Sequence, residues 1–495
     1  GAYCGPLGPL TIIIPTILEK SNNYIIPYSV LNDSGLSNLF SEHILEIISC
    51  PCSGAVIKKR HEIFESLQDQ NFYDRFNAAY LAMADYCKCL AFFKDEMPFI
   101  QKLFVISAVA KKYFYALKEL SLIPENGEYM TNLHYQVETL IDNSTSASEA
   151  YAKVCEYINA HNNCTIRFAN GSIVLARITE AEKKKRPFGL FESAAKILQK
   201  FGNSSNYSQI SLPIGLSPQI AEMIRVDEQE KFNLEAYIVL LSDCITKEIL
   251  RLKNEFGFYL QMYSFVNKMT DRKIPVCLPS IAESKEISMR NAHNYEVSSN
   301  FAANSIGNDV VAGENDSIVI ICGANGGGKT TYLNTILQNM ILFLAGCPVL
   351  CEKARIYPYS ELHSYFVDDE KCNKSRFEYE QERIKHIIID SGENESILFL
   401  NEPYSSTNEI NAIEQMNHLF NLARKRGLTV FVVTHFEIEK GQSYLVMSPI
   451  VDQNGKRTYK FERRLSAGAS MCADILKRYK CDYESLMQIV ESKKW

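Results

Sequence analysis

Apolar residues recur at helical spacing over much of the first half of the chain. Residues 36–122 contain few helix breakers, and their pattern predicts a succession of helices. Residues 124–230 are less regular, with short polar clusters and one strand-like fragment, "CTIRFANGSIVLARI". Apolar residues then recur at spacings of three and four from position 238 to position 263. This spacing predicts one long helix with an apolar seam that must pack against partner helices.

The pattern changes at "KIPVCLPSI", where Pro275 and Pro279 indicate a boundary. Beyond it, three short runs are apolar throughout, namely "DSIVIICG", "ESILFLN" and "GLTVFVVTH", and helical stretches separate them. Continuously apolar strands joined by helices are typical of a parallel sheet that is covered on both faces. The sequence therefore predicts a mostly helical domain over residues 1–285, with a short variable region around 124–230, and an α/β domain over residues 286–495.

Length and composition are those of a globular protein with more than one domain. A chain of 495 residues is too long for a single hydrophobic core. Apolar residues make up 46% of it and charged residues 22%, and no run approaches the roughly 20 apolar residues that span a bilayer. The N-terminal "TIIIPTILEK" lacks the basic leader of a signal peptide. We therefore expect a cytoplasmic protein with no membrane partner.

Net charge and cysteine content bear on nucleic-acid binding, disulfide bonds and zinc sites. The net charge of −6 argues against a uniformly basic nucleic-acid binder but leaves room for a local basic patch. The 15 cysteines are odd in number, and many lie in apolar segments, which favours reduced thiols over a disulfide framework. Neither "SCPCS" nor "YCKCL" has the ligand spacing of a zinc site.

The first of the apolar strands runs into a glycine-rich segment, "GANGGGKTT", and a helical stretch follows. This segment, residues 323–331, matches G-x-x-x-x-G-K-S/T in the order of strand, loop and helix that the motif requires. Its glycines let successive N–H groups point at phosphate oxygens, and the helix N-terminus adds its positive end. We expect Lys329 to neutralise the β- and γ-phosphates of a nucleotide and the Thr330 hydroxyl to bind Mg²⁺.

Polar residues end the other two apolar strands. "LFLNEP" places Asn401 and Glu402 at the end of the second strand, and "VVTH" places His435 at the end of the third. We expect Glu402 to orient and activate water, and Asn401 stands where an Asp would normally face the metal. His435 is a candidate sensor of the γ-phosphate. The alternatives are that the polar pair only caps its strand and that the histidine is structural.

Together, these motifs resemble the ATPase domain of the DNA mismatch repair MutS family, a branch of the ABC-type ATPases. The resemblance rests on "GANGGGKTTYL" as the phosphate loop, "SRFEYEQERI" as the signature, "LFLNEPYSSTNE" as the Walker B strand and loop, and "VFVVTH". The segments "NAHNYEV" and "SIGNDV" before the loop and "RRLSAGASMCADILKRY" after it are similar to further family segments. No segment resembles the mismatch-reading domain of the family, and we expect that domain to be absent.

The N-terminal part is similar to the same family. Its segment "SNLFSEHILEIISCPCSGAVIKKRHEIFESLQD" resembles the start of the helical lever domain, and the helix predicted over residues 238–263 resembles the returning arm of that domain. The resemblance thus implies a P-loop ABC-type ATPase domain with an α/β fold at the C-terminus, preceded by a mostly α-helical lever and core domain.

The resemblance also implies a set of site residues. The residues expected to hold ATP are Gly323, Asn325, Gly326, Gly327, Gly328, Lys329, Thr330 and Thr331. Among them, Asn325 would approach the γ-phosphate, and Thr330 would serve the Mg²⁺ ion together with Asn401. In this family two ATPase domains pack head to tail, so Ser375 of the signature would complete the catalytic site of a second subunit.

The implied function is that of a homodimeric ATPase whose arms move on DNA in repair, recombination or defence. The basic run Lys183, Lys184, Lys185 and Arg186 is a candidate for contacts with DNA phosphates, or else a solvated loop. Two alternatives involve no DNA: an ATP-gated machine that acts on an unknown protein partner, and a nucleotide-binding scaffold without turnover. Because Asn401 replaces the usual Asp, we expect hydrolysis of ATP to be slow.

Overall fold

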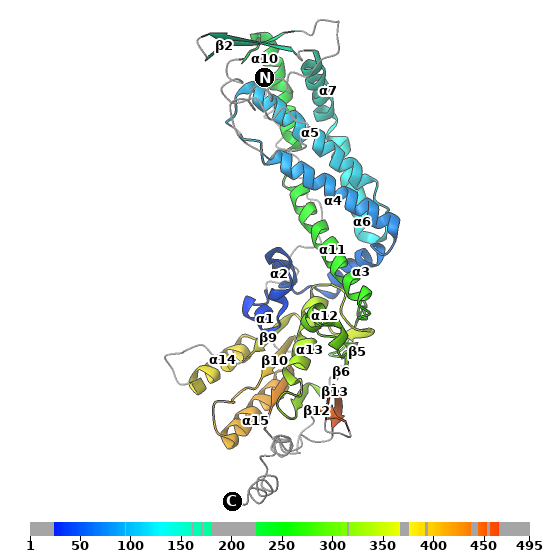
Figure 1. The fold of residues 1–495 in the computed structure, drawn as a ribbon, viewed down its shortest axis with the longest axis vertical. Helices are drawn as coiled ribbons and strands as arrows, with labels where there is room; N and C mark the ends of the chain where they lie inside the picture. The colour runs from blue at the N-terminus through cyan, green and yellow to red at the C-terminus, as the bar shows by residue number, and fades with distance from the viewer. Residues whose placement is uncertain are drawn as a thin grey trace, which may run out of the picture. The chain divides into compact units, whose positions relative to one another are not determined.

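The computed structural model of the chain (Figure 1) describes residues 24–94, 96–160, 163–169, 172–179, 224–313, 316–366, 376–391, 395–436, 444–452 and 456–464. These residues fall into two compact units. Residues 65–260 belong to the first, which we call the helical unit. Residues 24–64 and 261–464 belong to the second, which we call the α/β unit. The α/β unit therefore contains a segment from near the N-terminus.

Helices dominate the helical unit. They are α4 (Gln70–Leu90), α5 (Phe99–Ser121), α6 (Gly127–Asn143), α7 (Thr145–Ala160), α10 (Glu228–Leu241) and the short η2 (Ser242–Cys244). Two further helices, α3 (Gly54–Ser66) and α11 (Glu248–Asp271), each contain a boundary between the units. The predicted strand-like fragment is an antiparallel hairpin of β1 (Asn163–Ala169) and β2 (Ser172–Thr179), and β2 also pairs with β3 (Ile224–Arg225).

Aromatic side chains fill the centre of the helical unit. Phe76 of α4 and Phe256 of α11 stack with their ring centroids 3.8 Å apart and their planes 4° from parallel. At the start of α4, the Asp69 carboxylate accepts a hydrogen bond from the Phe72 N–H and so caps the helix. Phe256 belongs to the apolar seam predicted from the sequence, and this part of the seam packs against a partner helix as expected.

The helix predicted as continuous over residues 238–263 is broken. α10 is followed by η2, and α11 begins only after a non-helical stretch. Tyr86 of α4 supplies hydrogen bonds at the break, because its hydroxyl donates to the Cys244 carbonyl at 2.8 Å and accepts from the Thr246 N–H at 3.0 Å. The prediction of a single helix was wrong, since apolar spacing does not reveal backbone groups that bond to a distant side chain.

The α/β unit contains two sheets and the helices around them. Its helical elements are α1 (Tyr28–Asp33), η1 (Leu36–Asn38), α2 (Glu42–Ile48), α12 (Tyr295–Asn300), η3 (Ala302–Asn304), α13 (Lys329–Leu344), α14 (Arg376–Asp390) and α15 (Glu409–Lys425). Its strands are β4 (Ser280–Ile281), β5 (Ile287–Ala292), β6 (Asn308–Ala312), β7 (Ile318–Cys322), β8 (Lys353–Ile356), β9 (Glu361–Tyr365), β10 (Ser396–Asn401), β11 (Thr429–Thr434), β12 (Leu445–Val451) and β13 (Arg457–Arg464).

The larger sheet has the strand order β13-β12-β7-β11-β10-β9. Its strands from β12 to β9 run parallel, and β13 pairs antiparallel with β12. The three strands predicted from their apolar runs are β7, β10 and β11, and their parallel arrangement is confirmed. Because β11 lies between β7 and β10, the carboxyl ends of the three strands lie side by side at one edge of the sheet. The smaller sheet has the order β4-β8-β5-β6.

Helices cover the larger sheet on both faces. Alternate residues of β7, β10 and β11 share one core with residues of α14 and α15, among them Ile320, Leu398, Val432, Ile384 and Met416. The intervening strand residues point to the other face. There, α13 packs against β7, β10 and β11. The prediction of a parallel sheet with helices on both sides is therefore confirmed.

The N-terminal segment of the α/β unit, residues 24–64, bonds to the end of α13. The Cys52 N–H donates to the Leu344 carbonyl at 2.7 Å. The Arg60 guanidinium donates to the Ala345 carbonyl at 2.5 Å and is only 1% exposed. A buried cation thus lies at the C-terminal end of α13, where the helix dipole favours positive charge.

Three further properties hold for the part of the chain that the structure describes. Its cysteines are free thiols, as the sequence predicts. None of its helices combines the length and apolarity needed to cross a membrane. It contains no group of three or more His, Cys, Asp and Glu side chains arranged to hold a metal ion.

Candidate functional site

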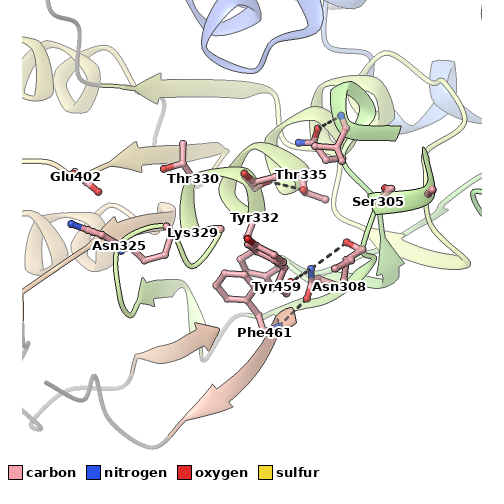
Figure 2. Close-up of a pocket in the computed structure, with 17 residues that line it drawn as sticks. Ser305, Asn308, Asn325, Lys329, Thr330, Tyr332, Thr335, Glu402, Tyr459 and Phe461 are labelled. Carbon is pink, nitrogen blue, oxygen red and sulfur yellow. Dashed lines mark hydrogen bonds between the residues drawn. The ribbon is translucent and has the colours of Figure 1, made fainter. Parts of the chain in front are cut away.

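A glycine-rich loop joins β7 to α13, in the order that the sequence motif predicts (Figure 2). Gly326 and Gly328 have φ values of +69° and +87°, in the left-handed region that other residues rarely adopt. A Cβ atom on Gly326 would lie 2.3 Å from a guanidinium nitrogen of Arg457. At Gly328 the carbonyl accepts from the Tyr332 N–H at 2.8 Å, which starts α13. This loop conformation therefore requires glycine at both positions.

The Lys329 side chain folds back over the loop. Its Nζ atom donates to the Gly323 carbonyl at 2.7 Å, and to the Ala324 carbonyl and Asn325 Oδ1 at 3.3 Å each. The residue is 5% exposed. Burial lowers the pKa of its ammonium group below the usual value, an effect that the Glu402 carboxylate opposes. A cation thus lies at the N-terminus of α13, and both features favour a bound anion.

Glu402 and His435 meet where β10 and β11 end. His435 Nε2 lies 2.6 Å from Glu402 Oε1, and Lys329 Nζ lies 3.3 Å from His435 Nδ1. A neutral imidazole with its proton on Nε2 satisfies both contacts, because Nε2 then donates to Glu402 and Nδ1 accepts from Lys329. The hydrogen bond from His435 holds the pKa of Glu402 below its usual value. Glu402 is therefore an ionised carboxylate at neutral pH, connected through the histidine to the lysine of the loop.

Thr330 and Asn401, the pair predicted to serve a metal ion, also lie together. Thr330 Oγ1 donates to Asn401 Oδ1 at 3.2 Å, which links the first turn of α13 to the end of β10. Hydroxyl and amide oxygens are among the hard ligands that suit Mg²⁺. Segments far apart in the chain thus bring the loop, Asn401, Glu402 and His435 to one place.

A cavity of about 760 Å³ opens beside the loop. Its lining includes Asn325, Gly326, Gly328, Lys329, Thr330, Thr331 and Glu402 at the loop, and Asn308, Tyr332, Tyr459 and Phe461 beyond it (Figure 2). The rings of Tyr332 and Phe461 stack with their centroids 4.2 Å apart. The Asn308 side chain donates to the Tyr459 carbonyl at 3.0 Å and accepts from the Phe461 N–H at 2.9 Å. A small molecule with an anionic end and a planar end fits such a lining.

Arg457 of β13 is a loop contact that no sequence pattern indicated. Its guanidinium donates to the Gly326 carbonyl at 2.8 Å and to the Asn325 carbonyl at 2.7 Å. Arg457 reaches the loop because β13 pairs with β12 at the sheet edge. Arg457 is one of five basic residues in "NGKRTYKFERR", and nothing in this segment distinguishes it as a contact of the loop.

Several features predicted from the sequence lie outside the described residues. They are Ser375, the basic run Lys183, Lys184, Lys185 and Arg186, and all but the first two residues of "RRLSAGASMCADILKRY". Their predicted roles stay predictions. Ser375 is the residue directly before α14 in the chain.

Sequence comparison relates the α/β unit to a known family, because residues 319–469 match MutS domain V. The chain is 27% identical to DNA-binding protein MutS2 of Pyrococcus furiosus over 231 residues, which are 45% of this chain and 40% of the relative. It is 23% identical to Endonuclease MutS2 of Streptococcus suis over 209 residues, which are 41% of this chain and 26% of the relative. It is 22% identical to Endonuclease MutS2 of Streptococcus pneumoniae over 228 residues, which are 45% of this chain and 28% of the relative.

The mixed α/β sheets that follow the helical region, with a glycine-rich loop at the sheet edge, fit a MutS domain V. The similarity to the MutS family is thus shown for residues 319–469, and the relatives named MutS2 match less than half of this chain. The matched stretch spans 40% of the Pyrococcus relative and 26% of the Streptococcus suis relative, which is less than half of either protein.

Proposed function

We propose that this chain is a MutS-type ATPase that binds ATP with Mg²⁺ in the cavity beside the glycine-rich loop and hydrolyses it slowly. One observation carries the proposal, namely that distant segments gather five polar residues around this loop. These residues are Lys329, Thr330, Asn401, Glu402 and His435. The match of residues 319–469 to MutS domain V supports ATP as the nucleotide.

Lys329 and the loop are proposed to hold the triphosphate. The Lys329 ammonium group is already removed from water and bonded to loop carbonyls. A phosphate oxygen that accepts from it instead would gain a charge-assisted hydrogen bond, which is stronger than a bond to a neutral carbonyl. The positive-φ glycines Gly326 and Gly328 keep side chains away from the loop backbone, so its N–H groups can approach phosphate closely.

Glu402 is proposed to accept a proton from the attacking water. Its pKa lies below the usual value, so the carboxylate is in the basic form at neutral pH. His435 holds this carboxylate through Nε2 and contacts Lys329 through Nδ1. A change in the position of Lys329 on binding phosphate would therefore be felt by His435, which agrees with its proposed role as a sensor of the γ-phosphate.

Thr330 and Asn401 are proposed to serve the Mg²⁺ ion. Both side chains offer oxygen atoms, and these atoms lie 3.2 Å apart beside Lys329 in the loop. When bound, the metal would neutralise charge that develops on the transferred phosphoryl group. Asn401 offers a neutral acceptor where a carboxylate would add a negative charge. This missing charge is the reason for proposing slow turnover.

We also propose a homodimer that acts on DNA through its helical unit, with Ser375 of one subunit completing the site of the other. The name of the Pyrococcus relative, a DNA-binding protein, supports this choice of polymer. Lys183, Lys184, Lys185 and Arg186 are the proposed phosphate contacts. The net charge of −6 favours the alternative, an ATP-gated machine that acts on a protein partner.

Release of phosphate from ATP in the presence of Mg²⁺ tests the proposed function, with Lys329→Ala as the matched inactive control. Slow turnover that is lost in Lys329→Ala would support an ATPase, and a folded wild-type chain that releases no phosphate would refute it. Binding of duplex and branched DNA at increasing salt, with and without ATP, separates the two candidate functions. Absence of salt-sensitive binding in every nucleotide state would favour the protein partner over DNA.

A further inference from the structure

The turn after β10 holds two residues in an unusual backbone conformation. Glu402 has a φ of +53° and Tyr404 a φ of +62°. Residues with a Cβ atom are strained in this left-handed region and remain there only when surrounding contacts hold them. The conformation of this turn decides where the Glu402 carboxylate lies, so the contacts that hold the turn bear on hydrolysis.

A buried carboxylate on a neighbouring helix holds this turn. Glu380 of α14 is 1% exposed. Its Oε1 atom accepts from the Tyr404 N–H at 2.6 Å and from the Tyr365 hydroxyl at 3.2 Å, and its Oε2 atom accepts from the Ser406 hydroxyl. A carboxylate removed from water is costly unless donors surround it, and these three bonds supply them.

The turn is thus held from two sides. On one side, the Glu402 N–H donates to the Val433 carbonyl of β11 at 3.0 Å. On the other side, Glu380 holds Tyr404 and Ser406, which follow Glu402 by two and four residues. The Tyr404 side chain is 6% exposed and lies in the core shared with α14 and α15. Removing Glu380 would leave the strained turn held by the bond to β11 and by the packing of Tyr404, without the polar contacts that Glu380 makes from α14.

We propose that Glu380 is a positioning residue for ATP hydrolysis, which fixes the left-handed turn that aims the Glu402 carboxylate at His435. This inference rests on the proposed function. It also gives α14 a part in hydrolysis, because the helix that follows Ser375 in the chain bonds directly to the turn that carries Glu402. A shift of α14 along its axis would change the Glu380 contacts and, through them, the position of Glu402.

A positioning role predicts a specific split between binding and turnover. The contacts of Glu380 in the described part of the chain are with Tyr365, Tyr404 and Ser406, and none is with loop residues 323–331. Loss of the carboxylate should therefore lower kcat while the affinity for ATP stays the same. If Glu380 were merely structural, its loss would lower the stability of the chain and the affinity for ATP together, or would leave both kcat and the affinity for ATP unchanged.

The test compares Glu380→Gln with the wild-type chain in steady-state hydrolysis and in nucleotide binding. The glutamine amide keeps the size of the side chain but has one acceptor oxygen, so its NH₂ group must face a donor. We expect kcat to fall by about tenfold to a hundredfold, with the Kd for ATP changed less than about twofold. The matched control is Asp390→Asn, which removes an exposed carboxylate from the far end of the same helix, outside the signature, and should leave kcat unchanged.

A second variant covers the case in which Glu380→Gln does not fold. Ser406→Ala removes one donor and leaves the carboxylate with Tyr365 and Tyr404, so it should lower kcat by about threefold to tenfold at unchanged Kd. The positioning role would be overturned by a folded Glu380→Gln variant that keeps the wild-type kcat or that loses kcat and ATP affinity in parallel. If Glu380→Gln does not fold, a wild-type kcat in Ser406→Ala would overturn it. A wild-type chain without turnover would instead refute the proposed function, and the inference with it.

Discussion

Asn401→Asp places a carboxylate at the end of β10, where the resemblance to the MutS family predicts one. Asn401 Oδ1 lies 3.2 Å from Thr330 Oγ1, so the new charge would lie beside the other proposed ligand of Mg²⁺. A hydrogen bond to a charged group contributes about 1.5–3 kcal/mol, against about 1 kcal/mol for a neutral pair. Each increment of about 1.4 kcal/mol in the transition state changes the rate tenfold. The gain over the neutral amide is thus about 0.5–2 kcal/mol, and the chemical step should accelerate by about twofold to thirtyfold if the whole gain is made in the transition state.

Single-turnover hydrolysis measures this step separately from product release. The protein is kept in excess over ATP at saturating Mg²⁺, and conversion to ADP is followed in time. Asn421→Asp, an equal change of charge at an exposed position on α15, is the matched control and should keep the wild-type rate. An unchanged or lower rate for Asn401→Asp would mean that other groups hold the metal and that Asn401 only ends its strand.

Three further predictions concern the loop, the carboxylate and DNA. Gly326→Ala should lower the free energy of unfolding, measured with denaturant, by about 1–3 kcal/mol, because alanine is strained at a φ of +69° and its Cβ would meet Arg457. Wild-type stability would refute the need for glycine at this position. The His435 hydrogen bond holds the pKa of Glu402 below its ordinary value of 4.5. The difference in free energy of unfolding between the wild type and Glu402→Gln should therefore be constant above pH 4.5 and should shrink as the pH falls through the lowered pKa. A difference that does not change with pH would contradict this. Replacement of residues 183–186 by serine should weaken DNA binding equally across sequences and flatten its salt dependence, and an unchanged slope would assign these residues to a solvated loop.

Local motifs account for what the sequence alone could predict. "GANGGGKTT" has glycine where the loop adopts positive φ, at Gly326 and Gly328 among others. The three apolar runs specify buried parallel strands, and polar residues at the ends of such strands must lie along one edge. Asn401, Glu402 and His435 therefore come together as a direct consequence of pattern and chain direction.

Contacts between distant segments account for what the sequence could not predict. Residues 24–64 have the same helical pattern as the segments that follow, yet they belong to the α/β unit, where Arg60 bonds to the end of α13. Arg457 reaches the loop only through the pairing of β13 with β12. Tyr86 bonds to the backbone at the break before α11, and Glu380 bonds to the turn that carries Glu402. Neither contact produces a periodic pattern in the sequence.

Calorimetric titration of ATP with Mg²⁺ into the wild-type chain and into Lys329→Ala tests the nucleotide site directly. Lys329 is the buried cation of the loop, so its removal should weaken ATP binding by at least about tenfold to a hundredfold, the loss expected for a charged hydrogen bond. Lys425→Ala, which removes an exposed lysine from α15, is the matched control and should bind like the wild type. Saturable binding by the wild type that is lost in Lys329→Ala and kept in Lys425→Ala is the predicted result. Equal affinity of the wild type and Lys329→Ala for ATP would contradict the assignment of the loop as the site of the triphosphate.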